Sequence, residues 1–106
     1  MTVMKNYDIE RIAEMEELYA CLIKEVSEIM HEIDRGELSL LQIEEKRDAL
    51  QEQIDRMADY YESEEWLADF EADEAGLLPE GLSRGVLSED GVYNLLEQYA
   101  ETGYNK

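Results

Sequence analysis

The segment of residues 8–33 reads DIERIAEMEELYACLIKEVSEIMHEI and decides the fold of this chain. Its apolar residues recur at alternating spacings of three and four positions, which is the pattern of one face of an amphipathic helix. These residues are Ile12, Met15, Tyr19, Leu22, Val26, Ile29 and Ile33. Asp8 is suited to cap the start of the helix, and Gly36 is suited to the left-handed conformation that ends one. The pattern predicts a long helix over this segment.

The same spacing returns after Ser39, which forms the S-x-x-Q pattern of a capping box with Gln42. This second stripe consists of Leu40, Ile43, Arg47, Leu50, Ile54, Met57 and Tyr61. Two long helices joined by a turn this short must run antiparallel, so residues 1–62 are predicted to form a helical hairpin. Arg47 alone interrupts the apolar stripe. We expect its guanidinium to lie in the hairpin groove near a glutamate of the first helix; the alternative is a contact between copies of the chain.

A new helix start follows the hairpin. Ser63, followed by two glutamates and Trp66, is typical of a helix N-terminus, and Gly76 marks the end of this short acidic helix. The pattern leaves open whether the short helix continues the second helix of the hairpin or breaks from it at Ser63.

The rest of the chain completes an all-α domain. Residues 76–87 contain glycines, the only proline and several apolar residues, so they are predicted to form an ordered Gly/Pro loop. Ser88 and the two acids after it are suited to start a last helix, which ends before Gly103. We therefore expect a single domain, residues 1–106, in which the elements of residues 63–106 pack on one end of the long antiparallel hairpin.

Three short stretches carry a family resemblance. They are YESEEWLADFEADEAGLLP at residues 61–79, RGVLSED at residues 84–90 and YNLL at residues 93–96. In their order, these stretches resemble the bacterial and phage family called domain of unknown function 4298. The resemblance covers about the C-terminal 40% of the chain, and the N-terminal hairpin is similar to the family only in being helical and acidic. It implies a small stand-alone soluble protein and no particular activity.

Charge and composition exclude several classes of function. The chain has 106 residues, with 28 acidic and 9 basic side chains and a net charge of −19. Nucleic acid and anionic membranes are therefore not expected as direct ligands, because binding them requires basic side chains. No apolar run approaches the roughly 20 residues of a membrane span, and no signal-peptide core precedes Asp8, which predicts a cytoplasmic protein. Cys21, the only cysteine, has apolar neighbours and is predicted to be a buried, inert thiol.

No motif in the sequence indicates catalysis, a metal or a cofactor. Glu28 and His31 have the spacing of half a di-iron motif, but His31 is the only histidine. The acids from Asp69 onward begin like a calcium loop, but Glu74 stands where that loop requires glycine. We therefore expect no enzyme, no cofactor, no metal site and no catalytic residue.

The acids are distributed unevenly. Between Arg56 and Arg84 there are nine acids and no basic residue, and a helical arrangement would space the carboxylates about as closely as the phosphates of a DNA strand. Tyrosines of the C-terminal half could anchor an interface there; they are Tyr60, Tyr61, Tyr93, Tyr99 and Tyr104. We expect Arg84 to pair with a neighbouring carboxylate; the alternative is a contact with a partner. The predicted partner-binding residues are Asp59, Glu62, Glu64, Glu65, Asp69, Glu71, Asp73 and Glu74.

This pattern favours an acidic protein that docks on a basic protein partner. The leading hypothesis is an inhibitor of a nuclease or another nucleic-acid-processing enzyme, acting by nucleic-acid mimicry or site blocking, of the anti-CRISPR or anti-restriction type. The alternative is a coiled-coil adaptor that self-associates as a homodimer through the hairpin seam. The simplest explanation of the acids is a solvated face that keeps a small protein soluble.

Overall fold

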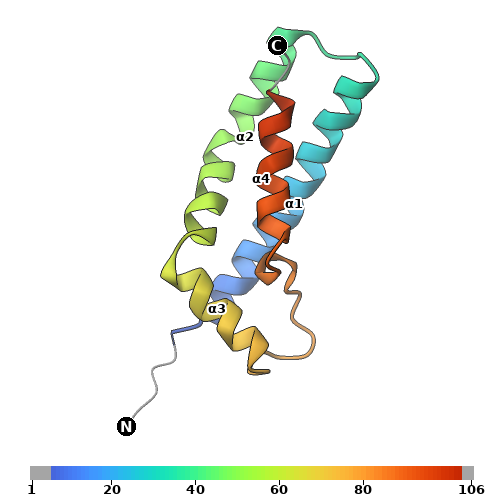
Figure 1. Cartoon of the computed structure of the whole chain (residues 1–106). Helices are drawn as coiled ribbons and strands as arrows, with labels where there is room; N and C mark the ends of the chain where they lie inside the picture. The colour runs from blue at the N-terminus through green and yellow to red at the C-terminus, as the bar shows by residue number, and fades with distance from the viewer. Residues whose placement is uncertain (1–5, 104–106) are drawn as a thin grey trace.

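The computed structural model describes residues 6–103, which form four α-helices and one short 3₁₀ helix and contain no strand (Figure 1). The elements are α1 (Ile9–Asp34), α2 (Leu40–Tyr61), α3 (Glu64–Glu74), η1 (Gly85–Leu87) and α4 (Gly91–Thr102). The predicted all-α fold is confirmed.

The hairpin of α1 and α2 begins and turns at the predicted capping residues. The Asp8 carboxylate accepts hydrogen bonds from the backbone N–H groups of Glu10 and Arg11, at 2.9 and 3.2 Å. At the turn, Gly36 adopts a φ of +68°, a conformation that residues with a β-carbon rarely adopt. Ser39 and Gln42 form both bonds of the capping box. These local signals are satisfied by neighbouring residues, which is why the sequence alone could reveal them.

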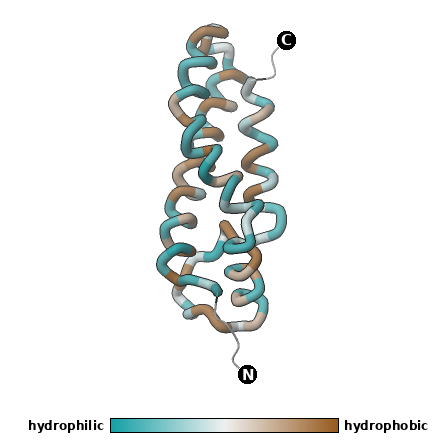
Figure 2. The backbone as a smooth tube through the Cα atoms, turned by 90° about the vertical axis from the view of Figure 1, so that its left-hand side faces the viewer, coloured by the Kyte–Doolittle hydropathy of each residue, from teal (hydrophilic) through white to brown (hydrophobic). Residues whose placement is uncertain are grey.

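Helix α4 lies along the hairpin between α1 and α2 (Figure 1). It begins near the α3 end of the hairpin and its last residue, Thr102, bonds to Arg47 of α2. The C-terminal elements therefore cover a large part of the groove, and the turn end of the hairpin extends beyond α4. Brown, hydrophobic positions recur along both long helices among teal ones, as their apolar spacing requires (Figure 2). The main core consists of Ile12, Met15, Leu22, Val26, Ile54, Met57, Tyr60, Ala72, Leu78, Val86, Leu87, Val92, Leu95 and Tyr99.

Arg47 does not pair with a glutamate of α1, so that prediction is wrong. Its guanidinium lies over the ring of Tyr99, 4.4 Å from the centroid, and its Nε donates to Thr102 Oγ1 at 2.9 Å. Tyr99 in turn donates its hydroxyl proton toward the Arg47 carbonyl and Gln51 Oε1. The C-terminus of a helix attracts cations because its carbonyls point outward unpaired, so Arg47 holds the end of α4 in the groove.

Cys21 is exposed, so the prediction of a buried thiol is also wrong. Successive helical residues point about 100° apart, and the neighbour Leu22 is the one that faces the core, with 1% of its surface exposed. The apolar neighbour Ile23 is itself 40% exposed. Apolar sequence neighbours therefore did not indicate burial at this position.

Helix α3 is separate from α2. Helix α2 ends at its C-cap Glu62. Ser63 then caps the start of α3, because its side chain accepts a hydrogen bond from the Trp66 backbone N–H at 3.1 Å. The Trp66 ring stacks on Phe70, with centroids 4.9 Å apart, and its Nε1 donates to the Val86 carbonyl at 3.0 Å. The stack lies within α3, whereas the bond to Val86 docks α3 against η1.

Candidate functional site

The predicted partner-binding acids lie where the end of α2 and the whole of α3 meet the start of α1. Six of the eight are exposed, and we call them the acidic surface. They are Asp59, Glu62, Glu64, Glu65, Glu71 and Glu74. The structure thus brings most of the predicted residues to one end of the molecule.

Asp69 is not part of this surface, because its side chain is fully buried. Its Oδ1 lies 2.6 Å from Arg11 Nη2 and its Oδ2 lies 2.9 Å from Arg11 Nε. The Tyr60 hydroxyl donates to Oδ2 at 2.6 Å, and the Asp8 backbone N–H donates to Oδ1 at 3.0 Å. A carboxylate with four such donors is a structural element of the fold, so the prediction that Asp69 contacts a partner is wrong.

Asp73 is half-buried and lies 3.3 Å from the Nε of Arg84. The expected pairing of Arg84 with a neighbouring carboxylate is therefore confirmed. The pair connects α3 to the loop before η1, and only 27% of the Asp73 side chain is exposed. Asp73 is accordingly a weaker candidate for partner binding than the six exposed acids.

Buried Asp69 has two neighbours whose pKa values are raised, Tyr60 and Arg11. The pKa of Tyr60 is raised well above its ordinary value. Burial is the main cause, and the hydrogen bond to Asp69 is the second. The hydrogen bond to Asp69 is also the main reason that the pKa of Arg11 is raised. Tyr60 therefore stays a neutral hydrogen-bond donor and Arg11 a cation at neutral pH.

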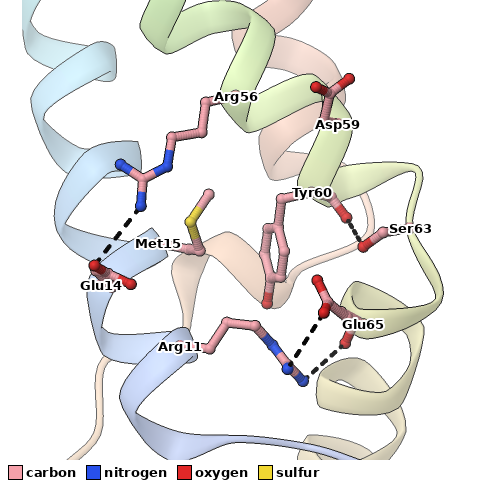
Figure 3. Close-up of a pocket in the computed structure, with 8 residues that line it drawn as sticks. All are labelled: Arg11, Glu14, Met15, Arg56, Asp59, Tyr60, Ser63 and Glu65. Carbon is pink, nitrogen blue, oxygen red and sulfur yellow. Dashed lines mark hydrogen bonds and ion pairs between the residues drawn. The ribbon is translucent and has the colours of Figure 1, made fainter.

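A cleft of about 330 Å³ opens beside this network, between α1, the end of α2 and the start of α3 (Figure 3). We call it the α3 cleft. The buried side chains of Met15 and Tyr60 lie at its base. Its other lining residues are Arg11, Glu14, Arg56, Asp59, Ser63 and Glu65. Because Asp59 and Glu65 belong to the acidic surface, the cleft and that surface are continuous.

The two arginines of the α3 cleft differ in how they are held. Arg11 is neutralised by the two-bond pair with buried Asp69, and its Nη1 is 4.0 Å from Glu65. Arg56 is 55% exposed, and its nearest carboxylate oxygen, on Glu14, is 3.7 Å away (Figure 3). When Arg11 and Asp69 are counted as a pair, the lining of the cleft contains three acids, Glu14, Asp59 and Glu65, and one loosely held cation, Arg56.

A second cleft of about 200 Å³ lies between α1 and α2 nearer the hairpin turn, and we call it the turn-end cleft. It also has three carboxylates, from Glu25, Glu28 and Glu32, and its own cation, Lys46, is 3.9 Å from Glu32. No aromatic ring lines it. It provides an internal comparison for the α3 cleft.

The tyrosines expected at the interface are divided. Tyr60 and Tyr99 are buried, Tyr61 is half-buried, and Tyr93 is 52% exposed. Tyr104 lies outside the described residues. Tyr93 is therefore the best placed of the four described tyrosines to contact a partner.

Residues 6–103 contain neither a metal cluster nor a membrane span. In this range, no group of three or more histidine, cysteine, aspartate or glutamate side chains is arranged to hold a metal ion. None of the helices in the same range combines the length and the hydropathy that crossing a bilayer requires.

The chain matches a known family. A family model described as a domain of unknown function (DUF4298) matches residues 12–104. The likeness therefore extends over both hairpin helices, and the estimate that it covers only the C-terminal 40% of the chain is wrong. A search of curated proteins returned no match, and a search of solved structures returned none either.

Proposed function

Since the chain belongs to the DUF4298 family, whose description names no function, we propose from its surface that it is an interaction protein that docks on a basic region of a partner protein. The acidic surface is the proposed contact. The partner would be a nuclease or another nucleic-acid-binding enzyme, which the protein would inhibit by occupying the site of a nucleic acid.

One observation carries this proposal: the outward side of α3 is a stripe of carboxylates without cations beside them. Glu64, Glu71 and Glu74 are exposed and make no ion pair with any residue of the described range. Their spacing of seven and three residues places them on one side of the helix. Leu67, which is 48% exposed, shares that side. The unpaired charges of such a stripe would speed association with a basic protein, and the apolar residue would lose its contact with water in the complex.

The charge density supports the finer proposal of nucleic-acid mimicry. With Asp69 buried and Asp73 paired, four glutamates remain available on α3, which is roughly 16 Å long at about 1.5 Å per residue. Glu64 and Glu74 are about 15 Å apart along the helix, so the mean spacing of the four carboxylates is about 5 Å, which is of the same order as the roughly 3.4 Å between phosphates of one DNA strand. An anti-CRISPR or anti-restriction inhibitor carried by a phage is the class of protein to which we assign this profile.

The adaptor alternative depends on an open hairpin seam. In this chain α4 lies in the groove, and the seam residues Leu22 and Ile54 are 1% and 5% exposed. A second copy would have to displace α4 before it could pack there. The geometry therefore supports docking through the acidic surface better than self-association through the seam.

The proposal is tested by charge reversal at matched positions. One variant carries Glu64→Lys, Glu71→Lys and Glu74→Lys. The control reverses three exposed glutamates of α2, namely Glu44, Glu45 and Glu52, so that both variants have the same net charge. Each protein is immobilised at low ionic strength, and captured basic proteins are quantified by mass spectrometry.

We expect the α3 variant to lose about tenfold or more of a specific basic protein that the control retains, and DNA to compete with the wild-type chain for it. Equal losses in both variants would show that capture reports net charge alone, and the proposal would then fail. Circular dichroism verifies that both variants are folded.

A further inference from the structure

The α3 cleft has the chemical character of a receptor for a long basic side chain. Met15 and Tyr60 line it, as do three acids, Glu14, Asp59 and Glu65, of which Asp59 points its carboxylate away from the other two in Figure 3. An arginine side chain has the complementary form, with an apolar stem and a planar cation at its tip. A volume of about 330 Å³ is ample for one such side chain.

The charges in the cleft favour a cationic occupant. Arg11 does not oppose one, because its charge is compensated by Asp69 at 2.6 Å. The remaining carboxylates outnumber the remaining cation, Arg56, three to one. Glu14 and Glu65 each have 67% of their side chain exposed, so they can turn toward an entering group without a large change in the core.

Arg56 places a guanidinium at the wall of the cleft in the free chain. It lies among the lining residues and points toward Glu14 (Figure 3). At 3.7 Å and with both side chains more than half exposed, this pair is weakly held and can be exchanged for a partner's cation. Elsewhere in the molecule, Arg47 over Tyr99 shows that a tyrosine ring of this chain supports a guanidinium in a long-range contact.

We infer that the α3 cleft receives one arginine side chain of the basic partner, and that Arg56 holds this position until the partner's arginine replaces it. The inference deepens the proposed function and rests on it, since the cleft is continuous with the acidic surface. It assigns two roles. The outward stripe of α3 attracts the basic surface, and the cleft anchors one of its side chains.

The probe for the cleft is N-acetyl-arginine amide, which carries a single guanidinium, titrated into isotope-labelled full chain at low ionic strength and followed by amide chemical shifts. N-acetyl-citrulline amide is its neutral counterpart. We expect the arginine probe to shift the amides around Asp59, Tyr60 and Ser63 in preference to those around the turn-end cleft. The citrulline probe should leave them unchanged.

Variants separate the cleft from general charge. Arg56→Gln removes the competing cation and should tighten binding of the arginine probe about threefold, whereas Arg35→Gln, which removes the same charge near the hairpin turn, should not. Asp59→Asn combined with Glu65→Gln should weaken binding by about threefold or more, and Glu25→Gln combined with Glu28→Gln should leave it unchanged.

The inference is overturned if the probe shifts both clefts equally, if citrulline acts like arginine, or if Arg56→Gln and Arg35→Gln have the same effect. These outcomes are independent of the capture experiment. If capture of a basic partner depends on the α3 stripe but the arginine probe does not bind the cleft, only the anchoring role is overturned. If the cleft binds the arginine probe but the charge reversals do not change capture, the proposed function is overturned instead.

Discussion

The Asp69 carboxylate of α3 and the Arg11 guanidinium of α1 form a two-bond ion pair across 58 residues of sequence, with contacts of 2.6 and 2.9 Å. The Asp69 side chain is fully buried and that of Arg11 is 21% exposed. The pair connects the acidic helix to the first turn of α1, and the hydroxyl of Tyr60 completes it from α2. Three helices therefore meet at one carboxylate, and the position of the acidic surface depends on it.

Replacing Asp69 with asparagine should strongly destabilise the fold. The variant leaves Arg11 without its counter-charge in a partly buried site, and breaking such a pair typically costs about 3 kcal/mol or more. The matched control is Asp73→Asn, which breaks the more exposed pair with Arg84 and should cost less than about 1 kcal/mol. Urea unfolding followed by circular dichroism measures both, and similar losses in the two variants would contradict the assignment.

The stability of the protein should fall in alkaline solution, in part through Tyr60. Burial and the hydrogen bond to Asp69 raise its pKa in the folded chain above the ordinary value of 10.0. Below about pH 10 the hydroxyl is protonated in both states, so its contribution is complete. Above that pH the unfolded chain loses the proton first, and the free energy of unfolding decreases by up to about 1.4 kcal/mol for each further pH unit.

Tyr60→Phe should remove this part of the pH dependence while lowering stability at neutral pH, because Asp69 loses a donor. Urea midpoints compared between about pH 9 and about pH 11 test the expectation. The pKa values of Tyr19, Tyr93 and Tyr99 are raised as well, so the variant should keep a shallower slope and not a flat one. A slope identical to that of the wild-type chain would refute the role of Tyr60.

Gly91→Ala should destabilise the protein even though alanine ordinarily favours a helix. A β-carbon at Gly91, the first residue of α4, would lie 2.5 Å from both Ser88 Oγ and Tyr19 Oη and 3.0 Å from the Gly85 carbonyl oxygen. The crowding should cost about 1 to 2 kcal/mol. Gly81→Ala, which meets no atom within 4 Å, should change stability by less than about 0.5 kcal/mol, and thermal unfolding of the two variants distinguishes them.

The exposed thiol of Cys21 should react with a thiol reagent in the folded protein nearly as fast as in urea. The measurement is the rate of labelling by an aromatic disulfide in native buffer and in denaturant. Reaction that is slower by orders of magnitude in native buffer would mean that the thiol is buried after all. Cys21→Ser provides the background rate.

Signals that depend on neighbouring residues could be predicted from the sequence. The hairpin helices follow from apolar spacing, and the capping roles of Asp8, Ser39 and Ser63 follow from hydrogen bonds that close within a few residues. Gly76, with a φ of +75°, ends α3 for the same local reason. None of these contacts requires knowledge of how the helices pack.

Contacts between distant elements could not be predicted in this way. Asp69 is one of 28 acids, and only the docking of α3 distinguishes it from the others. The available signal was the position of Asp69 around the helix axis. Asp69 lies three residues from both Trp66 and Ala72 and therefore shares their inward side. No sequence motif singled out Arg11. It lies four residues before buried Met15 and therefore on the same side of α1, which is the same kind of signal.

The single tryptophan of the chain gives this arrangement an optical signature. Trp66 is stacked on Phe70, meets the ring of Tyr61 edge-on at 5.1 Å, and donates its indole proton to the Val86 carbonyl. Separation of α3 from the bundle would break the contacts of Trp66 with Tyr61 and Val86, which lie outside α3, and would expose the indole to water. Its fluorescence emission therefore reports, without any added dye, whether the acidic helix is docked or free, and it does so in the same cuvette in which a partner is titrated.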